Sequence, residues 1–126
     1  MYLLDTNILI YYTNGSIPDS FKNDIEGMMA ENFNICIITK LEYLGWRGFD
    51  DASLNKAEQF VGYADIINID SEIADKAVEI MRSKNINMAD AVIAATALEN
   101  NFTLVTRNAD DFKKVKNLKI LNPFEE

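Results

Sequence analysis

Short apolar runs alternate with longer amphipathic stretches along this chain. Five runs have the length of a buried strand, and they cover residues 2–4, 35–38, 66–69, 102–105 and 119–121. In the stretches between them, apolar residues recur every three or four positions, which predicts helices. We expect these helices directly after Asp5 and over residues 20–31, 39–47, 52–62, 71–83, 88–100 and 109–116. Continuous apolar strands separated by helices are typical of a parallel sheet covered on both faces.

This order of elements predicts the α/β fold class. We expect one three-layer domain, in which helices flank a mostly parallel five-stranded sheet. The chain has 126 residues, and 48% of them are hydrophobic, which is enough to fill one core without metal or disulfide links. No repeat or linker divides the sequence, so we assign residues 1–126 to a single domain.

The residue types that are missing exclude several kinds of chemistry. The chain has no histidine and one cysteine, Cys36. Zinc fingers, disulfide scaffolds and catalysis by a histidine are therefore excluded. Cys36 lies within an apolar run, and we expect it to be buried. We find no targeting segment and no apolar run of membrane-spanning length, and we expect a cytoplasmic protein without a membrane partner.

Acidic residues gather where the predicted strands end. Asp5 follows the first strand, Glu42 lies one helical turn after the second, and Asp70 follows the third. Asp110 and Asp111 come after the fourth strand. Ligand sites of open α/β sheets lie at the carboxyl ends of the strands, so these positions are the first to consider for function.

Two acids are predicted to be partly buried. Asp5 stands between apolar runs, and Asp90 shares a helical stripe with Ala94 and Ala97. A buried carboxylate needs a partner that offsets the cost of removing it from water. Because the chain offers carboxylates but no histidine, a hard cation such as Mg²⁺ or Mn²⁺ is the partner that this chemistry favours.

Helix capping is an alternative role for three of the acids. Each stands three positions after a threonine or asparagine that could cap a helix, in the pairs Thr39 and Glu42, Asn87 and Asp90, and Asn108 and Asp111. A helix N-terminus stabilises a nearby acid through its dipole, whatever else the acid does. Capping and cation binding are compatible, and the sequence leaves both open.

Four stretches occur together in an order that is known from one protein family. They are LLDTNIL at residues 3–9, ITKLE at 38–42, MADAVIAATAL at 88–98 and LVTRN at 104–108, the last followed closely by Asp111-Phe112. On these stretches the chain resembles PIN-domain proteins, and most closely VapC-type toxins of type II toxin–antitoxin pairs.

The resemblance implies an endoribonuclease that depends on Mg²⁺ or Mn²⁺. It implies catalytic and metal-binding roles for Asp5, Glu42 and Asp90. The family's fourth acid often follows the Thr-Arg pair directly, where this chain has Asn108. We therefore assign the fourth role to Asp111, with Asp110 as its competitor.

The resemblance also suggests supporting groups and partners. Residues that it assigns to orient the carboxylates or their ligands are Thr6, Thr106 and Asn108. Substrate binding by Arg107, Lys113 and Lys114 is inferred instead from the cluster of basic residues over 107–119, for which an ordinary solvated helix face is the open alternative. The expected partners are an RNA substrate and a cognate antitoxin, in a homodimer or a toxin–antitoxin hetero-oligomer. A formal charge of −8 argues against nucleic-acid binding by a uniformly basic surface, although cations held by the acids would reverse the charge locally.

A receiver-type signalling module is the alternative function. Such a module would bind Mg²⁺ and be phosphorylated on Asp70, which we otherwise expect to cap the helix that follows it. The receiver pattern also needs paired acids after the first strand and a lysine after the fifth. The chain has Asp5-Thr6 and Asn122-Pro123 at these places, so this alternative is the weaker one.

Overall fold

A five-stranded sheet forms the centre of the molecule. The computed structural model describes residues 1–124. The strands are β1 (Tyr2–Leu4), β2 (Asn34–Cys36), β3 (Asp65–Ile67), β4 (Thr103–Val105) and β5 (Ile120–Leu121). They are ordered β3-β2-β1-β4-β5, and every pairing is parallel. The predicted α/β class is confirmed, and the sheet is parallel throughout.

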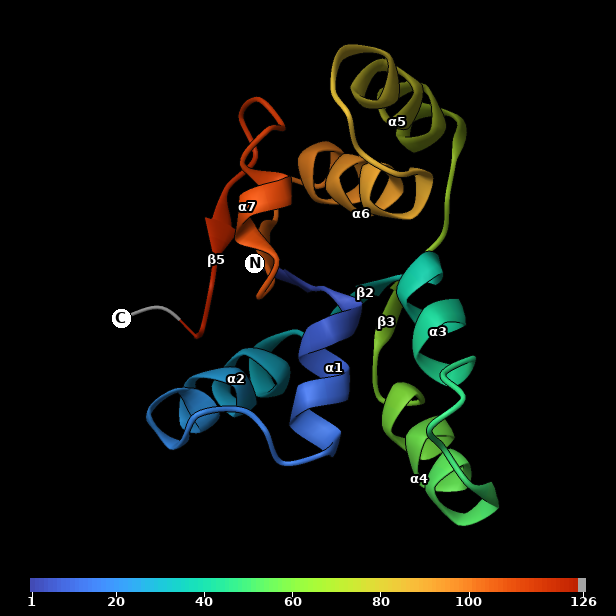
Figure 1. The fold of residues 1–126 in the computed structure, drawn as a ribbon, viewed down its shortest axis with the longest axis vertical. Coiled ribbons are helices and arrows are strands. Elements are labelled where there is room, and N and C mark those ends of the chain that lie inside the picture. Colours follow the sequence, from blue (N-terminus) through green and yellow to red (C-terminus); the bar gives the residue numbers. More distant parts are fainter. Residues whose placement is uncertain (125–126) are drawn as a thin grey trace.

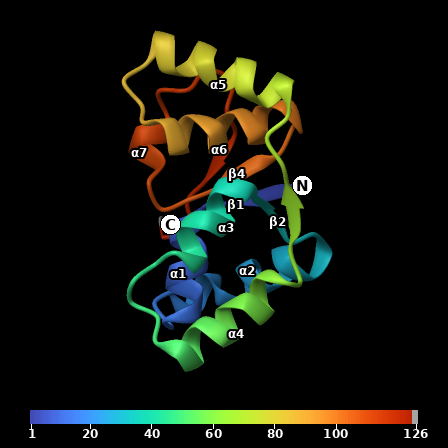
Figure 2. The same cartoon turned by 90° about the vertical axis from the view of Figure 1, so that its right-hand side faces the viewer.

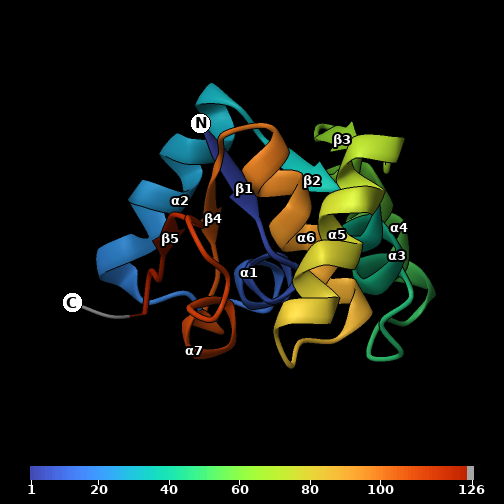
Figure 3. The same cartoon turned by 90° about the horizontal axis from the view of Figure 1, so that it is seen from above.

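Helices cover both faces of this sheet (Figure 1). They are α1 (Thr6–Thr13), α2 (Asp19–Glu31), α3 (Ile37–Leu44), α4 (Asp51–Val61), α5 (Ser71–Ser83), α6 (Met88–Glu99) and α7 (Ala109–Phe112). Figure 2 shows α5 and α6 on one side of the strands and α1, α2 and α4 on the other. Figure 3 shows α5 and α6 running alongside each other. The three predicted layers are therefore present.

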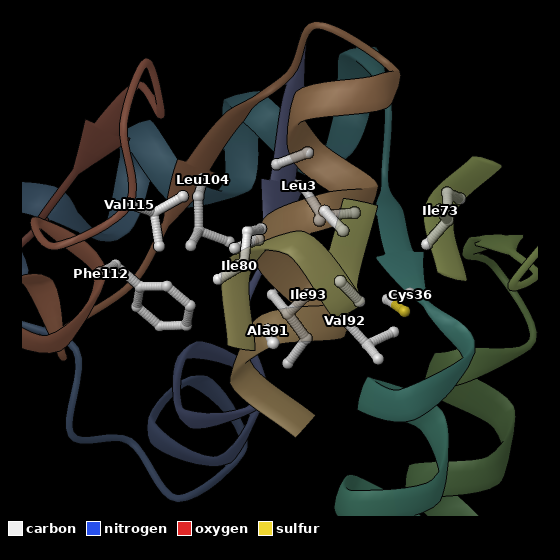
Figure 4. Close-up of a cluster of buried hydrophobic side chains, with 14 residues drawn as sticks. Leu3, Cys36, Ile73, Ile80, Ala91, Val92, Ile93, Leu104, Phe112 and Val115 are labelled. Carbon is white, nitrogen blue, oxygen red and sulfur yellow. The ribbon is translucent and has the colours of Figure 1, made fainter. Parts of the chain in front are cut away.

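Alternate residues of β1, β2, β3 and β4 enter two separate cores. Leu3, Cys36 and Leu104 pack with α5 and α6, while their neighbours Leu4 and Val105 pack with α1 and α2. Figure 4 shows the first of these clusters, in which Phe112 of α7 also lies. Because the strands are buried on both faces, they read as uninterrupted apolar runs in the sequence. Among residues 1–124, no helix is long and apolar enough to cross a membrane.

Several predicted boundaries were wrong by a few residues. The run predicted as a strand to residue 38 leaves the sheet at Cys36, and Ile37 already begins α3. Ile37 and Ile38 are still apolar because they pack against the α5–α6 core from a helix. Similarly, β3 ends at Ile67, and α7 ends at Phe112 instead of continuing to residue 116. Apolar character shows that a residue is buried, but it does not show in which element.

The capping predictions had different outcomes. Asp70 caps α5, accepting from the Ile73 N–H at 2.8 Å, as predicted. The Thr39–Glu42 capping box was wrong, because α3 begins before Thr39, which is fully buried inside the helix.

Cys36 is buried, as expected, and the Thr96 hydroxyl lies 3.4 Å from its Sγ.

Candidate active site at the carboxyl edge of the sheet

Asp5 lies where β1 passes into α1 and is the buried centre of the candidate site. It is 5% exposed and is the N-cap of α1, with the Thr6 N–H donating to Oδ1 at 2.8 Å. The Thr106 hydroxyl donates to Oδ2 at 2.8 Å and the Asn7 amide donates to it at 3.2 Å. The neighbouring strand β4 thus supplies Thr106 to fix the carboxylate that follows β1.

Burial raises the pKa of the Asp5 carboxyl from its ordinary 3.8 to about 6. The hydrogen bonds from Thr106 and Thr6 favour the charged form and oppose this rise, whereas the charges of Asp90 and Glu42 add to it. Asp5 is therefore a carboxylate in an environment that is short of positive charge. A cation beside it would lower its pKa and stabilise the ionised form.

Glu42 and Asp90 reach the same region from α3 and α6. The Thr6 hydroxyl donates to Glu42 Oε1 at 2.7 Å, which ties α3 to the start of α1. Asp90 is half-buried, and its backbone N–H donates to the capping oxygen of Asn87 at 2.8 Å. The Asn87 amide in turn donates to the Asp90 carboxylate at 3.2 Å. The predicted Asn87 cap is confirmed, and it holds Asp90 at the first turn of α6.

Asp111 stands apart from Asp110 in its contacts. The Asn108 amide donates to Asp111 Oδ2 at 2.9 Å, and Lys114 Nζ lies 3.7 Å from Oδ1. The Asp110 side chain is 94% exposed, and within residues 1–124 its one ion pair is with Lys113, at 3.6 Å. The backbone N–H of Asn108 donates to the Thr106 hydroxyl at 2.9 Å, so Asp111 is linked through this loop to the group that holds Asp5.

The four carboxylates influence one another electrostatically. Partial burial raises the pKa of Asp90, and the charges of Glu42 and Asp111 raise it further, while the Asn87 hydrogen bond opposes the rise. Asp5 is affected by Asp90 and Glu42 in the same way. Within residues 1–124, no three of these side chains converge closely enough to form a ready-made metal-binding group. The fold brings the acids into mutual repulsion, which a bound cation would relieve.

The basic residues near the site are of two kinds. Lys113 and Lys114 each pair with an acid three residues earlier, Asp110 and Asp111. Arg107 instead lies over the rings of Tyr11 and Phe124, with its Cζ 5.0 Å and 4.5 Å from the ring centroids. The three predicted substrate contacts are therefore not equivalent.

Asn7 is a linking residue to which the sequence interpretation gave no role. Its amide nitrogen donates to Asp5 and lies 3.4 Å from the Thr106 hydroxyl, and its Oδ1 accepts from the Arg107 N–H at 3.3 Å. It therefore joins the loops after β1 and β4. Its position directly after Asp5-Thr6 was the one sequence signal for this role. Its partners Thr106 and Arg107 lie about one hundred residues further along the chain.

Asp70 is separated from this arrangement. β3 is the edge strand, with β2 between it and β1, and the Asp70 carboxylate is engaged in capping α5. It is thus not grouped with Asp5, as the receiver-type alternative would need. That alternative is not favoured by the structure.

The fold and the site together define a class of protein: a parallel α/β domain with carboxylates at the carboxyl ends of its strands. The PIN domain family model matches residues 2–118. The chain is 30% identical over 132 residues to Ribonuclease VapC2 of Rickettsia felis, covering 97% of both chains. The crystal structure of VapBC2 from Rickettsia felis, bound to a DNA fragment from its promoter, superposes with a TM-score of 0.80 at 29% identity, covering 96% of this chain and 97% of the other. A toxin–antitoxin complex from Klebsiella pneumoniae gives 0.78 at 26% identity and full coverage of both chains.

The chain therefore belongs to the PIN-domain family, and within it to the group of the VapC ribonucleases.

Proposed function

We propose that this protein is a divalent-cation-dependent endoribonuclease and the toxin of a toxin–antitoxin pair. The observation that carries the proposal is the buried Asp5 at the end of β1, with the charges of Glu42 and Asp90 acting on it from two other elements. Family membership supports a nuclease, and the carboxylates supply the chemistry that such a nuclease needs. Cellular RNA as the substrate is consistent with action in the cytoplasm.

The donor set fits a hard cation. Asp5, Glu42, Asp90 and Asp111 would hold Mg²⁺, or Mn²⁺ in its place, through carboxylate oxygens and water. When bound, such a cation supplies charge that polarises a phosphate and lowers the pKa of an attacking water. Thr6, Thr106 and Asn108 orient the carboxylates by the hydrogen bonds described above. The carboxylate side chains therefore lose little conformational freedom when a cation binds.

The carboxylates of the site differ in how firmly they are held. Asp5 is kept in place by three donors and cannot rotate without breaking them. Glu42, on α3, and Asp111, on α7, are exposed, so their side chains are accessible to a ligand. Histidine is absent from the chain, so no imidazole takes part in the proton chemistry.

Purified protein incubated with total cellular RNA and Mn²⁺ or Mg²⁺ tests this proposal. We expect cleavage that stops when a chelator is added and that leaves 5′-phosphate and 3′-hydroxyl ends, as hydrolysis by a water molecule attacking the phosphate would. Gel analysis with and without the chelator measures the first result, and sequencing of the new ends by ligation that requires a 5′-phosphate or a 3′-hydroxyl measures the second. Cleavage that survives chelation, or ends carrying a cyclic phosphate, would refute the metal-dependent reaction.

Asp111 and Asp110 should differ in their effects on this activity. We expect Asp111→Asn to lower kcat about 10- to 100-fold, because Asp111 is tied to the site through Asn108. Asp110→Asn should change kcat less than about twofold, because its side chain is directed to solvent. Initial rates on one defined RNA give the comparison, and the reverse order would move the fourth role to Asp110.

We propose a basic antitoxin as the protein partner. The VapBC2 and Klebsiella pneumoniae structures are complexes of a toxin with its antitoxin, which supports a corresponding partner here. A formal charge of −8 favours a partner of opposite charge, whose association would weaken with salt. A homodimer or a toxin–antitoxin hetero-oligomer are the assemblies that we propose.

A further inference from the structure

Arg107 is held by a clamp of two aromatic rings and the C-terminal segment. Its guanidinium lies 5.0 Å from the Tyr11 centroid and 4.5 Å from that of Phe124, and the two rings are 5.2 Å apart at 63°. Both distances to the cation are within the range of a cation–π interaction. We call Tyr11, Asn122 and Phe124 the Arg107 clamp.

Asn122 fixes the clamp to the loop that carries Arg107. Its amide donates to the Arg107 carbonyl at 3.4 Å, and its Oδ1 accepts from the Phe124 N–H at 2.9 Å. Pro123, between these two residues, is buried. The segment after β5 therefore returns over α1 and places Phe124 against the arginine.

The clamp lies beside the candidate carboxylates. Thr106, before Arg107, donates to Asp5, and Asn108, after it, donates to Asp111. The Arg107 backbone N–H donates to Asn7, which also contacts Asp5. One short loop thus carries a hydroxyl that fixes one acid, an amide that fixes another, and a stacked cation between them.

Arg107 differs from the neighbouring lysines in its contacts within residues 1–124. Lys113 and Lys114 are within 4 Å of Asp110 and Asp111, at 3.6 Å and 3.7 Å. Within residues 1–124, Arg107 makes no ion pair, and its side chain is exposed. Stacking occupies the face of a guanidinium and leaves its N–H edge free, and that edge matches a phosphate.

We propose that Arg107, oriented by the clamp, binds a backbone phosphate of the RNA next to the phosphate that is cleaved. This rests on the proposed function, and it adds a phosphate-binding group and the device that positions it. An RNA approaching four carboxylates needs a nearby cation to offset the repulsion. An arginine loses rotamer entropy when it is fixed, and here the clamp fixes it before substrate arrives. Phe124 and Tyr11 are positioning residues, since they act through Arg107.

Binding of RNA by a protein that cannot cut it tests the proposal. In the Asp5→Asn background with Mg²⁺, a fluorescein-labelled single-stranded RNA is titrated across a range of salt concentrations, and anisotropy is measured. Adding Arg107→Ala should weaken binding about tenfold and reduce the slope of log K against log salt by about 0.7, the value for one lost phosphate contact on single-stranded RNA. A matched loss of one charge on α4, Lys56→Ala, should leave the slope unchanged.

Variants that keep the charge separate positioning from electrostatics. Phe124→Leu and Arg107→Lys should weaken binding about two- to fivefold while the salt slope stays the same, because the cation remains but its orientation or its N–H fork is lost. In the active protein, Arg107→Ala should raise KM more than it lowers kcat. Circular dichroism confirms that each variant is folded.

Two results would overturn the proposal. If Arg107→Ala leaves affinity and salt slope unchanged, Arg107 does not bind RNA. If it lowers kcat at constant KM, Arg107 acts on the transition state or on the loop and does not bind a neighbouring phosphate of the RNA. Failure of the proposed function would look different, because the unsubstituted protein would then bind RNA through Arg107 without cutting it in Mg²⁺ or Mn²⁺.

Discussion

Replacing Asp5 with asparagine should abolish RNA cleavage while the fold is retained. Asparagine has nearly the same shape and is a good N-cap, so α1 keeps its start. It lacks the negative charge, however, and it sits at the most buried of the four carboxylate positions. We expect kcat/KM to fall by about 10³-fold or more, equivalent to about 4 kcal/mol of lost transition-state stabilisation. Initial rates on a defined RNA in Mg²⁺ measure the loss.

An acid of similar type away from the site is the control for this variant. Asp75 is exposed on α5, and Asp75→Asn changes the net charge by the same amount. Its activity should remain within about twofold of the unsubstituted protein, as expected for an exposed site outside any network. Cleavage by Asp5→Asn within tenfold of the unsubstituted protein would show that the proposed site is wrong.

The layers of the fold could be predicted because burial leaves a direct trace in the sequence. Leu3 and Leu4 face different cores, so both must be apolar, and the strand appears as an unbroken run. The same signal fails at the end of β2, where Cys36 and Ile37 are both apolar although the chain changes from strand to helix between them. Whether a buried residue lies in a strand or a helix is decided by backbone pairing with distant residues, which periodicity over a few positions does not contain.

The position of the acids could be predicted, but their hydrogen-bond network could not. Parallel strands bring their carboxyl ends to one edge, so Asp5 and the residues after β4 had to lie near each other. The donation from Thr106 to Asp5 depends on the register of Leu4 opposite Val105. Register follows from side-chain packing across the whole sheet, and for the same reason the contact of Phe124 with Tyr11 has no local sequence signal.

The charge of Asp5 should also cost stability when no cation is present. Its folded pKa of about 6 lies above its ordinary 3.8, so the folded state holds a proton more tightly than the unfolded chain does. Stability should therefore rise as the pH falls from above 6 toward 4, where the carboxyl becomes neutral in the folded protein first. Well above pH 6, Asp5 is ionised in both states, and the protein carries the full loss of folding stability. The difference between the two pKa values limits this loss to about 3 kcal/mol.

Asp5→Asn should consequently be more stable than the unsubstituted protein in a chelator at about pH 7.5. We expect a gain of about 1–2 kcal/mol. This is less than the full cost of the charge, because the amide makes poorer hydrogen bonds with Thr106 and Asn7 than the carboxylate does. The advantage should shrink as the pH is lowered to about 5, where Asp5 is largely protonated. Urea unfolding at both pH values measures it.

Millimolar Mg²⁺ should reverse this order of stability. A cation that binds only the folded state stabilises it by mass action, so the unsubstituted protein gains stability while Asp5→Asn gains little. Asp75→Asn, which keeps the four carboxylates, should respond to Mg²⁺ as the unsubstituted protein does. An equal response to Mg²⁺ in the Asp5→Asn variant would place the cation elsewhere. A difference in stability that is independent of pH would mean that the cost at Asp5 comes from packing, since only a titrating charge disappears as the proton binds.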